Sequence, residues 1–381
     1  MLRACLTILL VATSTLANAA TPVIPPPPNI AGSSYLLIDA ATDKVIVEHN
    51  AHQPLPPASL TKIMTSYVAG YELEQGRIGL DDMVPISVKA WSMGGSKMFI
   101  REGTQVRLED LLRGIIIQSG NDASVAMAEH IGGSEDAFAD MMNHHAAELG
   151  MTNTHFVNAT GWPADGHATS AWDLALLTKA LINGHPDMYA LYAERSFKFG
   201  DIEQSNRNRL LWRDKTVDGV KTGHTEAAGY CLVASAERDG MRLISVVMGT
   251  ASEEARMRES SKLLSYGFRY FETRELYGAE VPLKQVELFY GENEEFSLGL
   301  AEPAVVTFPR GHYEDLEAEL ATPSIVEAPL TQGDEVGELV LRLGGDSIYR
   351  APLVALSDEA ESGWLSSFSD FVYLFFRELL E

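Results

Sequence analysis

The chain has 381 residues, more than a single hydrophobic core usually organises, so two domains are expected. Hydrophobic residues make up 46% of the sequence, a fraction typical of globular proteins that argues against a largely disordered chain. The formal net charge of −24 at pH 7 would repel the phosphates of nucleic acid, so DNA and RNA are not expected partners.

Residues 1–19 have the pattern of a secretory signal peptide. A basic residue precedes an apolar run, and the segment ends in Ala-Asn-Ala, the small-x-small pattern of a cleavage site. The alternative is a membrane anchor, for which the run is short. Cleavage would leave Cys231 as the single cysteine, so no internal disulfide is expected. A proline-rich segment follows over 20–32 and is predicted to be an extended leader.

The region 33–272 has strand patterns at both ends and helical patterns between them. A β-hairpin is predicted over 34–50, and amphipathic helical patterns dominate from 59 to 179. Strand patterns return over 218–250, and a helix is predicted over 258–272. This order favours an α/β (α+β) domain in which a sheet of strands from both ends of the region lies beside a helical cluster.

The remaining sequence is predicted to form a small β domain and a terminal helix. Short alternating runs punctuated by glycine and proline over 273–360 indicate an all-β sandwich. Aromatic and aliphatic residues at spacings of three and four over 361–381 predict an amphipathic helix suited to a membrane surface. This helix is poor in lysine, so insertion of its aromatic residues would have to drive binding. A contact between copies of the chain, or a helix docked on the body, is the alternative.

The stretch PASLTKIMT places Ser59 and Lys62 one helical turn apart at the start of a helical pattern. Residues at i and i+3 share a helix face, so the amine of Lys62 can lie beside the hydroxyl of Ser59. A serine needs a neighbouring base to act as a nucleophile, and a lysine acts as that base when burial or a second cation lowers its pKa. The pair alone is a common pattern, and an N-cap serine followed by a lysine would also produce it.

Two further motifs add polar groups that suit the same chemistry. QSGNDA contains Ser119 and Asn121 at a glycine turn within a helical pattern, and GVKTGHT contains 221–223 in a strand pattern. Lys221 is expected to be the second cation that holds Lys62 neutral, with Ser119 hydrogen-bonded between the two lysines. Gly223 is expected to let a substrate backbone approach the strand edge.

Serine-x-x-lysine, serine-x-asparagine and lysine-threonine-glycine, in this order, are shared by penicillin-binding proteins and class A β-lactamases. The stretches PASLTKIMTSYV, RGIIIQSGNDASVAMAE and VDGVKTGHTEAAGY resemble the low-molecular-mass penicillin-binding proteins of the penicillin-binding protein 5 type, which are serine D-alanyl-D-alanine carboxypeptidases. The resemblance extends over the β-rich domain and the terminal helix. It implies a penicillin-recognising transpeptidase/β-lactamase-like domain for 33–272.

The resemblance also implies roles for individual residues. Ser59 would be the acylated nucleophile and Lys62 its base, Ser119 and Asn121 would line the cleft, and Lys221 would complete the proton network. The backbone N–H groups of Ser59 and His224 would form the oxyanion hole. The groups expected to receive the terminal carboxylate of the substrate are Thr222, Arg207 and Arg256.

The implied substrate is the peptidoglycan stem pentapeptide, with β-lactams as acylating inhibitors and with no metal or cofactor. The implied location is the periplasmic side of the cytoplasmic membrane, with peripheral attachment by the terminal helix. Acidic and histidine side chains at 140, 144 and 148 share one helix face, but their pattern is more typical of a solvated surface than of a metal site.

Three other functions are alternatives to a carboxypeptidase. A β-lactamase would need a glutamate to orient the deacylating water, and the interval GWPADGHATSAWDLALL offers Asp165 and Asp173 but no Glu-x-x-Leu-Asn motif. A DD-endopeptidase acting on peptide cross-links would use the same acyl-enzyme. An inactive wall-binding scaffold would be expected to have lost Ser59, Lys62 or Lys221, all of which are present.

Overall fold

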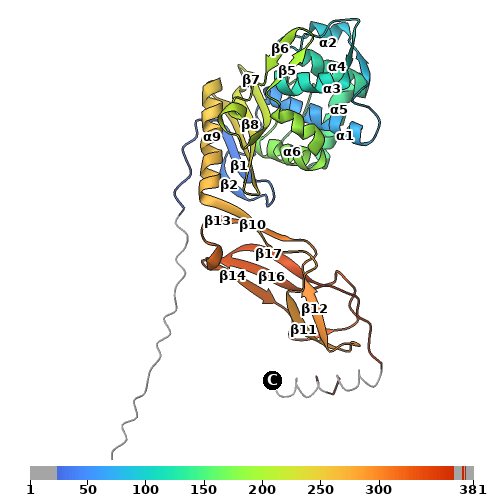
Figure 1. The fold of residues 1–381 in the computed structure, drawn as a ribbon, viewed down its shortest axis with the longest axis vertical. Coiled ribbons are helices and arrows are strands. Elements are labelled where there is room, and N and C mark those ends of the chain that lie inside the picture. The colour runs from blue at the N-terminus through green and yellow to red at the C-terminus, as the bar shows by residue number, and fades with distance from the viewer. Residues whose placement is uncertain (1–23, 364–370, 373, 375–381) are drawn as a thin grey trace, which may run out of the picture. The chain divides into compact units, whose positions relative to one another are not determined.

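The computed structural model describes residues 24–363, 371, 372 and 374 (Figure 1). The signal peptide predicted over 1–19 and most of the helix predicted over 361–381 lie outside the described residues. The described chain forms two compact units. One comprises 25–275 with 305–310, and the other comprises 276–304 and the chain from 311 onward.

A five-stranded antiparallel sheet forms the centre of the first unit. Its strand order is β2-β1-β9-β8-β7, so β1 lies between β2 and β9, a strand some two hundred residues later in the chain. The strands are β1 (Ser34–Asp39), β2 (Val45–His49), β7 (Val217–Thr225), β8 (Gly229–Arg238) and β9 (Met241–Thr250). The expected hairpin and the expected sheet of strands from both ends of the region are confirmed, and β7 lies at an edge.

The two faces of this sheet are covered by different helices. Leu36 and Ile38 of β1 belong to the core shared with the helical cluster. Leu37, between them, lies against Gly267 of α9 (Glu253–Tyr270) on the opposite face. This alternation follows from the two-residue period of a strand. α9 begins earlier than the helix predicted over 258–272 because the hydroxyl of Ser252 accepts a hydrogen bond from Ala255 N at 3.1 Å and caps it.

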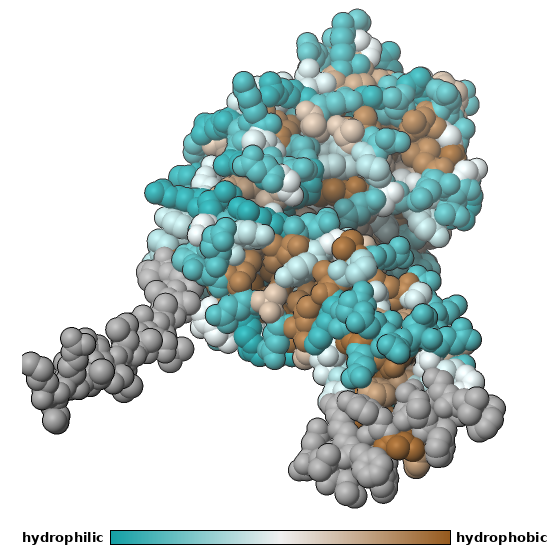
Figure 2. All heavy atoms as spheres, turned by 60° about the horizontal axis from the view of Figure 1, so that its bottom comes forward, coloured by the Kyte–Doolittle hydropathy of each residue, from teal (hydrophilic) through white to brown (hydrophobic). Residues whose placement is uncertain are grey.

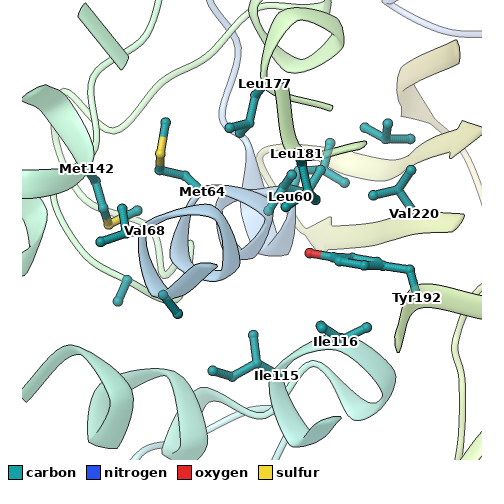
Figure 3. Packing of buried hydrophobic residues seen from close by; sticks show 14 of the residues in the cluster. Leu60, Met64, Val68, Ile115, Ile116, Met142, Leu177, Leu181, Tyr192 and Val220 are labelled. Carbon is teal, nitrogen blue, oxygen red and sulfur yellow. The ribbon is translucent and has the colours of Figure 1, made fainter. Parts of the chain in front are cut away.

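The helical cluster is built around α1 (Lys62–Glu74), as Figure 3 shows. Met64 and Val68 of α1 are surrounded by side chains from other elements, including Ile115, Met142 and Leu177. The helices of the cluster are α1, α2 (Val88–Ser92), α3 (Leu108–Arg113), α4 (Asn121–Gly132), α5 (Glu135–Glu148), α6 (Ala171–Gly184), α7 (Pro186–Tyr189) and α8 (Leu210–Arg213). Shorter turns are η1 (Ala58–Thr61), the π-helical η2 (Gly114–Gln118) and η3 (Ala190–Ala193).

Short strand pairs and the leader complete the first unit. The pairs are β3 (Met83–Pro85) with β4 (Gln105–Arg107), β5 (Ser196–Phe199) with β6 (Ile202–Ser205), and β10 (Phe271–Tyr277) with β13 (Ala304–Pro309). The described part of the leader has no regular structure and packs along α9. There the Tyr266 hydroxyl donates to Pro25 O at 2.8 Å, and Ala31 N donates to Glu259 at 3.3 Å.

The second unit is all-β, which confirms the class predicted for 273–360. Its six-stranded sheet has the order β14-β16-β17-β12-β11-β15, antiparallel except where β11 meets β15. The strands are β11 (Lys284–Phe289), β12 (Glu295–Gly299), β14 (Leu316–Ala321), β15 (Val326–Glu327), β16 (Glu335–Leu343) and β17 (Asp346–Ala355), with the turn η4 (Tyr313–Asp315) before β14.

Hydrophilic residues predominate on the face shown in Figure 2, and hydrophobic residues gather there in patches. Within the part of the chain that the structure describes, no helix is both long enough and apolar enough to cross a bilayer.

Replacing Met142 by alanine is expected to destabilise the first unit by about 2–5 kcal/mol, because it leaves a cavity against α1 in a core where this side chain is fully buried. Met83→Ala makes the same chemical change at a side chain that is 51% exposed, and a change within about 0.5 kcal/mol is expected. Thermal unfolding of both variants measures the difference, and equal shifts in Tm would contradict the core assignment.

Candidate active site

Ser59 lies in η1, the turn that leads directly into α1. Pro57 precedes this turn, and because proline has no backbone N–H the helical hydrogen bonds do not extend to the residues before it. Its carbonyl accepts a hydrogen bond from Leu60 N at 3.1 Å, which closes the turn. Lys62 is the first residue of α1, and its Nζ donates to Ser59 Oγ at 3.0 Å. The pairing expected from the spacing of the two residues is therefore present.

The amine of Lys62 is completely buried, with a relative exposure of 0% for the residue. Besides Ser59 it donates to Asn121 Oδ1 at 2.8 Å and to the backbone carbonyl of Thr160 at 2.5 Å. These acceptors come from the start of α4 and from the loop that follows α5. An ammonium group has three N–H donors, so all of them have partners in this site.

Burial lowers the pKa of Lys62 from 10.5 to about 7. The positive charge of Arg207 contributes to this lowering, and the negative charge of Asp122 opposes it. A substantial fraction of Lys62 is therefore neutral near pH 7. A neutral amine 3.0 Å from a serine hydroxyl can take its proton, which is the requirement for a general base.

Ser119 adopts the left-handed backbone conformation, with φ of 66° and ψ of 35°, at the end of η2. This conformation breaks the helical pattern between η2 and α4, as the sequence predicted. Its Oγ is buried and makes no hydrogen bond within the described residues, so the predicted bridge between the two lysines is not formed. A buried hydroxyl without a partner at this position is free to bond to a reacting group.

Asp122 is a supporting residue that the sequence analysis missed. Its carboxylate is 1% exposed and accepts backbone N–H groups from Met98 and Phe99, each at 2.8 Å. The neighbouring Asn121 donates from Nδ2 to Gly94 O at 2.8 Å. Together these bonds fix 94–99 as the wall of the cleft beside Ser119. Its place in the stretch QSGND, next to Asn121, was the sequence signal for a role in the site. An aspartate that is buried normally accepts several N–H groups.

Lys221 lies on β7 and is also buried, with its Nζ donating to the carbonyl of Thr222 at 3.1 Å. Burial lowers its pKa well below 10.5, and the charges of Lys62, Arg207 and Arg256 lower it further. The cation that lowers the pKa of Lys62 is Arg207. Lys62 in turn lowers the pKa of Lys221, so the two buried amines also interact, and the role of second cation for Lys221 stays a prediction.

The two arginines predicted to bind a carboxylate lie in different environments. Arg207 is exposed, with its Nε bonded to Gln118 O at 3.1 Å, and its neighbours Asn206 and Asn208 are buried and hydrogen-bonded. Arg256 is 4% exposed, and its Nη1 donates to Gly223 O at 3.1 Å. Arg207 is thus presented to a ligand, whereas Arg256 supports β7 by binding its backbone.

Two glycines allow the chain to approach the backbone around Ser59. A Cβ atom on Gly223 would come within 3.1 Å of Pro57 O, so this glycine lets the segment before Ser59 lie close to β7. The approach of a substrate backbone at this strand edge stays a prediction. A Cβ atom on Gly161 would lie 1.8 Å from Ala58 O. Gly161 also has φ of +81°, which favours glycine.

His167 is a second supporting residue that the sequence did not reveal. Its Nδ1 accepts a hydrogen bond from Val157 N at 3.0 Å, and its Nε2 lies 2.8 Å from Thr61 Oγ1. Burial lowers its pKa to about 4, so the ring is neutral near pH 7 and Nε2–H donates to Thr61. His167 therefore ties η1 to the loop that carries the Thr160 carbonyl.

The remaining predicted residues, Thr222 and His224, lie on β7. Thr222 is 5% exposed on β7, and His224 is exposed two residues later with its ring stacked on Tyr230 at 3.9 Å between centroids.

The described residues contain no group of three histidine, cysteine, aspartate or glutamate side chains placed to hold a metal ion. Cys231 is buried in β8, and burial raises its pKa to about 11.

Comparison with known proteins identifies relatives over most of the chain. The sequence model of the peptidase S11 family, described as D-alanyl-D-alanine carboxypeptidase, matches residues 20–252, and that of the penicillin-binding protein 5 C-terminal domain matches 271–361. The chain is 44% identical over 360 residues to D-alanyl-D-alanine carboxypeptidase DacC of Escherichia coli, covering 92% of this chain and 90% of that protein.

Solved structures show the same relationship. Penicillin-binding protein 5 from Haemophilus influenzae superposes with a TM-score of 0.85 at 41% identity, covering 88% of this chain and 99% of that one. Penicillin-binding protein D2 from Listeria monocytogenes in its ampicillin-bound form has a TM-score of 0.59 at 28% identity, covering 63% of this chain and 100% of that one.

The rate of serine acylation is expected to rise with pH and level off above about 7, because Lys62 acts as a base only when neutral. Below that pH the rate should fall about tenfold per unit. Stopped-flow acylation by a fluorescent β-lactam measures the profile. In Arg207→Gln the loss of a positive charge should raise the pKa of Lys62 and move the profile to higher pH. An unmoved profile would show that Arg207 does not act on Lys62.

Gly161→Ala is expected to lower the acylation rate by about a hundredfold or more, because the added methyl group collides with the backbone next to Ser59 and displaces it. Gly166→Ala is the matched control. Gly166 has the same φ of +81°, but the nearest heavy atom to its Cβ position is 3.9 Å away. It should cost about 1 kcal/mol of stability with little loss of rate. Similar acylation rates in the two variants would show that the contact at Ala58 does not position the nucleophile.

Proposed function

The chain belongs to the peptidase S11 family of D-alanyl-D-alanine carboxypeptidases, and on this basis we propose that it removes the terminal D-alanine from peptidoglycan stem pentapeptides through an acyl-enzyme on Ser59. The observation that carries this proposal is the hydrogen bond of 3.0 Å between Ser59 Oγ and a fully buried Lys62 amine whose pKa is lowered to about 7. A serine with such a base is an activated nucleophile.

Acylation begins when Ser59 Oγ attacks the carbonyl carbon between the two D-alanine residues and Lys62 Nζ accepts the hydroxyl proton. Negative charge then develops on the carbonyl oxygen. The backbone N–H groups of Ser59 and His224 stabilise it, since donors fixed before the reaction cost no reorganisation as the charge develops.

Departure of the terminal D-alanine requires a proton on its nitrogen. Ser119 supplies the relay, because its buried Oγ has no other hydrogen-bond partner within the described residues and borders the cleft that holds Lys62. The proton taken by Lys62 passes through Ser119 to the leaving amine, and the C–N bond breaks. Water then attacks the ester carbonyl while Lys62 accepts a proton from it. Lys62 returns this proton to Ser59 Oγ as the ester C–O bond breaks, which releases the shortened peptide and restores the enzyme.

The terminal carboxylate distinguishes an exopeptidase substrate, and the site offers groups to receive it. Thr222 lies two residues before His224 on β7, and Arg207 presents its guanidinium near Lys62 and Lys221. An arginine binds a carboxylate through two parallel hydrogen bonds. Arg256 contributes indirectly, because its hydrogen bond to Gly223 O holds the backbone of β7 in place.

β-Lactams are proposed to acylate the same serine because their strained amide resembles the D-alanyl-D-alanine bond. The ampicillin-bound relative supports this step. Rapid hydrolysis of the acyl-enzyme, as in a β-lactamase, is disfavoured by the loop around Thr160. Asp165 of that interval is exposed, whereas Asp173 is fully buried, and its Oδ2 accepts hydrogen bonds from Asn153 N at 2.8 Å and Thr154 Oγ1 at 2.6 Å.

An endopeptidase and an inactive scaffold fit these observations less well than a carboxypeptidase does. Cleavage of cross-links by an endopeptidase uses the same acyl-enzyme, but a relative 44% identical over 92% of this chain carries the name of a carboxypeptidase. An inactive scaffold is disfavoured because Ser59 and Lys62 are hydrogen-bonded to each other in the described structure.

We further propose that the protein is exported and acts on the periplasmic side of the cytoplasmic membrane. The signal pattern of 1–19 and the amphipathic pattern of 361–381 support this location. The substrate also supports it, because peptidoglycan lies outside the cytoplasm.

Ser59→Ala is expected to abolish both D-alanine release and the covalent β-lactam adduct, because it removes the hydroxyl that Lys62 Nζ contacts. Intact-mass spectrometry after addition of benzylpenicillin, with an enzymatic assay of D-alanine, measures the two activities. Ser265→Ala, which removes an exposed hydroxyl from α9, should retain both. D-alanine release by Ser59→Ala would refute the acyl-enzyme.

A further inference from the structure

A short loop between β6 and α8, residues 206–209, carries Arg207 and is called the Arg207 loop below. Asn206 and Asn208 flank the arginine on either side. Both asparagines are buried, with exposed fractions of 3% and 1%, whereas Arg207 is exposed. A buried amide group needs hydrogen-bond partners. The partners of these two side chains show which parts of the chain the loop connects.

Asn206 ties the start of the Arg207 loop to the segment that follows η3. Its Nδ2 donates to Glu194 O at 3.0 Å, and its backbone N–H donates to Arg195 O at 2.8 Å. Its Oδ1 accepts the backbone N–H of Asn208 at 2.9 Å. One side chain thus anchors the residue before Arg207 and fixes the backbone on both sides of it.

Asn208 connects the other end of the loop to β7. Its Oδ1 accepts the backbone N–H of Leu210 at 3.1 Å, a bond two residues along the chain that shapes the loop before α8. Its Nδ2 reaches across to β7 and donates to Gly219 O at 2.8 Å. Gly219 precedes Lys221 by two residues on this strand. Asn208 therefore joins the loop that carries Arg207 to the strand that carries Lys221.

The backbone at Gly219 is also held from a second side. A Cβ atom on Gly219 would lie 2.7 Å from the hydroxyl oxygen of Tyr189, so this ring lies against the glycine. The hydroxyl donates to Asp218 Oδ1 at 2.7 Å, and Arg242 Nη1 donates to Asp218 Oδ2 at 2.6 Å. Asn208 therefore bonds to a part of β7 that other contacts already fix, and the Arg207 loop takes its position from the strand.

Arg207 itself makes a third connection, on the side of the cleft. Its Nε donates to Gln118 O at 3.1 Å, and Gln118 is the last residue of η2, directly before Ser119. The charge of Arg207 lowers the pKa of Lys62 and that of Lys221. Because a Coulomb interaction depends on distance, both effects require the guanidinium to stay in one place. The backbone from which this exposed side chain extends must therefore be fixed.

We propose that Asn208 is a positioning residue for acylation, which holds Arg207 at its distance from Lys62 by joining the Arg207 loop to β7 through Gly219 O. Asn206 holds the other end of the same loop. Both asparagines act through Arg207 rather than on the reacting atoms. This inference rests on the proposed function, because acylation of Ser59 is the step that it affects.

The charged or titratable side chains that interact with Lys62 come from separate elements of the described chain: Arg207 from its loop, Asp122 from α4, Lys221 from β7 and His167 from the loop after α5. Asp122 is held by the backbone of 98–99, and His167 by Val157 N and Thr61. A change at Asn208 therefore reaches Lys62 through Arg207 or through β7. An experiment has to separate these two routes.

Asn208→Ser breaks the bond to β7 with little change to the loop itself. A serine hydroxyl can accept the N–H two residues along, as Asn208 Oδ1 does for Leu210, but it is too short to reach Gly219 O. A positive charge farther from Lys62 opposes its protonation less, so the pKa of Lys62 rises. The acylation profile should move to higher pH by about half a unit, roughly a threefold lower rate on its rising limb.

The double variant Arg207→Gln/Asn208→Ser separates the two routes. Stopped-flow acylation of the full-length protein by a fluorescent β-lactam measures the profile in each single variant and in the double variant. If Asn208 acts through Arg207, the double variant should show the same shift as Arg207→Gln alone, because the charge is already absent. Additive shifts would overturn the proposal, since they would show that Asn208 reaches Lys62 through β7.

Thr178→Ala is the structural control. It removes a buried hydroxyl that donates to Leu174 O at 2.7 Å within α6, so it should lower Tm without moving the pH profile. If Asn208→Ser does not yield folded protein, Asn206→Ser takes its place. Asn206→Ser loses the bond to Glu194 O, and the same shift is expected for it, again absent when Arg207 is already glutamine.

The outcomes keep the positioning role separate from the activity. A lowered Tm with an unmoved profile in Asn208→Ser, as in Thr178→Ala, would refute the positioning role and leave the carboxypeptidase intact. An unmoved profile in Arg207→Gln would also refute it, because the charge to be positioned would have no effect on Lys62. If the unmodified protein forms no β-lactam adduct on Ser59, the proposed function fails and this inference fails with it.

Discussion

Burial of the Lys62 amine is the constraint on which the rest of the site depends. The charged form of an amine loses its hydration when buried, so Lys62 is able to lose its proton near pH 7. The burial is tolerated because each N–H has an acceptor. These acceptors come from η1, from the start of α4 and from the loop at Thr160, so three separate parts of the chain must be in place together. Displacing any one of them would leave a buried polar group without a partner.

The same helix that carries the base also forms the centre of the core. Met64 and Val68 of α1 pack among side chains from the surrounding helices and from η2, as Figure 3 shows. Lys62 therefore cannot shift without moving well-packed side chains, and dense packing gives it one position. Gly161 and Gly223 extend this constraint to the other side of Ser59, because each brings a backbone segment close to residues 57–58. The packing that stabilises the first unit therefore also positions the nucleophile.

Much of this arrangement was readable from the sequence because it rests on local spacing. The interval between Ser59 and Lys62 places two side chains on one helix face, and the alternating runs around Lys221 predict the strands of the sheet. Contacts between distant segments were not readable in this way. Arg207 acts on Lys62 from a loop more than a hundred residues away, and His167 reaches Thr61 from another. No periodic pattern marks either residue, so sequence patterns alone assigned Arg207 no effect on Lys62 and assigned His167 no role.

The sequence by itself determined the main helical and strand regions, their order, the three motifs and the family, because helix and strand periods and short motifs are local properties of the chain. It did not predict the short strands β3 to β6. Tertiary structure alone decided how deeply Lys62 and Lys221 are buried, that Ser119 Oγ is left without a partner among the described residues, and that Gly223 faces the segment before Ser59. The physical reason is that burial, pKa and cavity shape depend on which distant segments come together, and that depends on the packing of the whole unit.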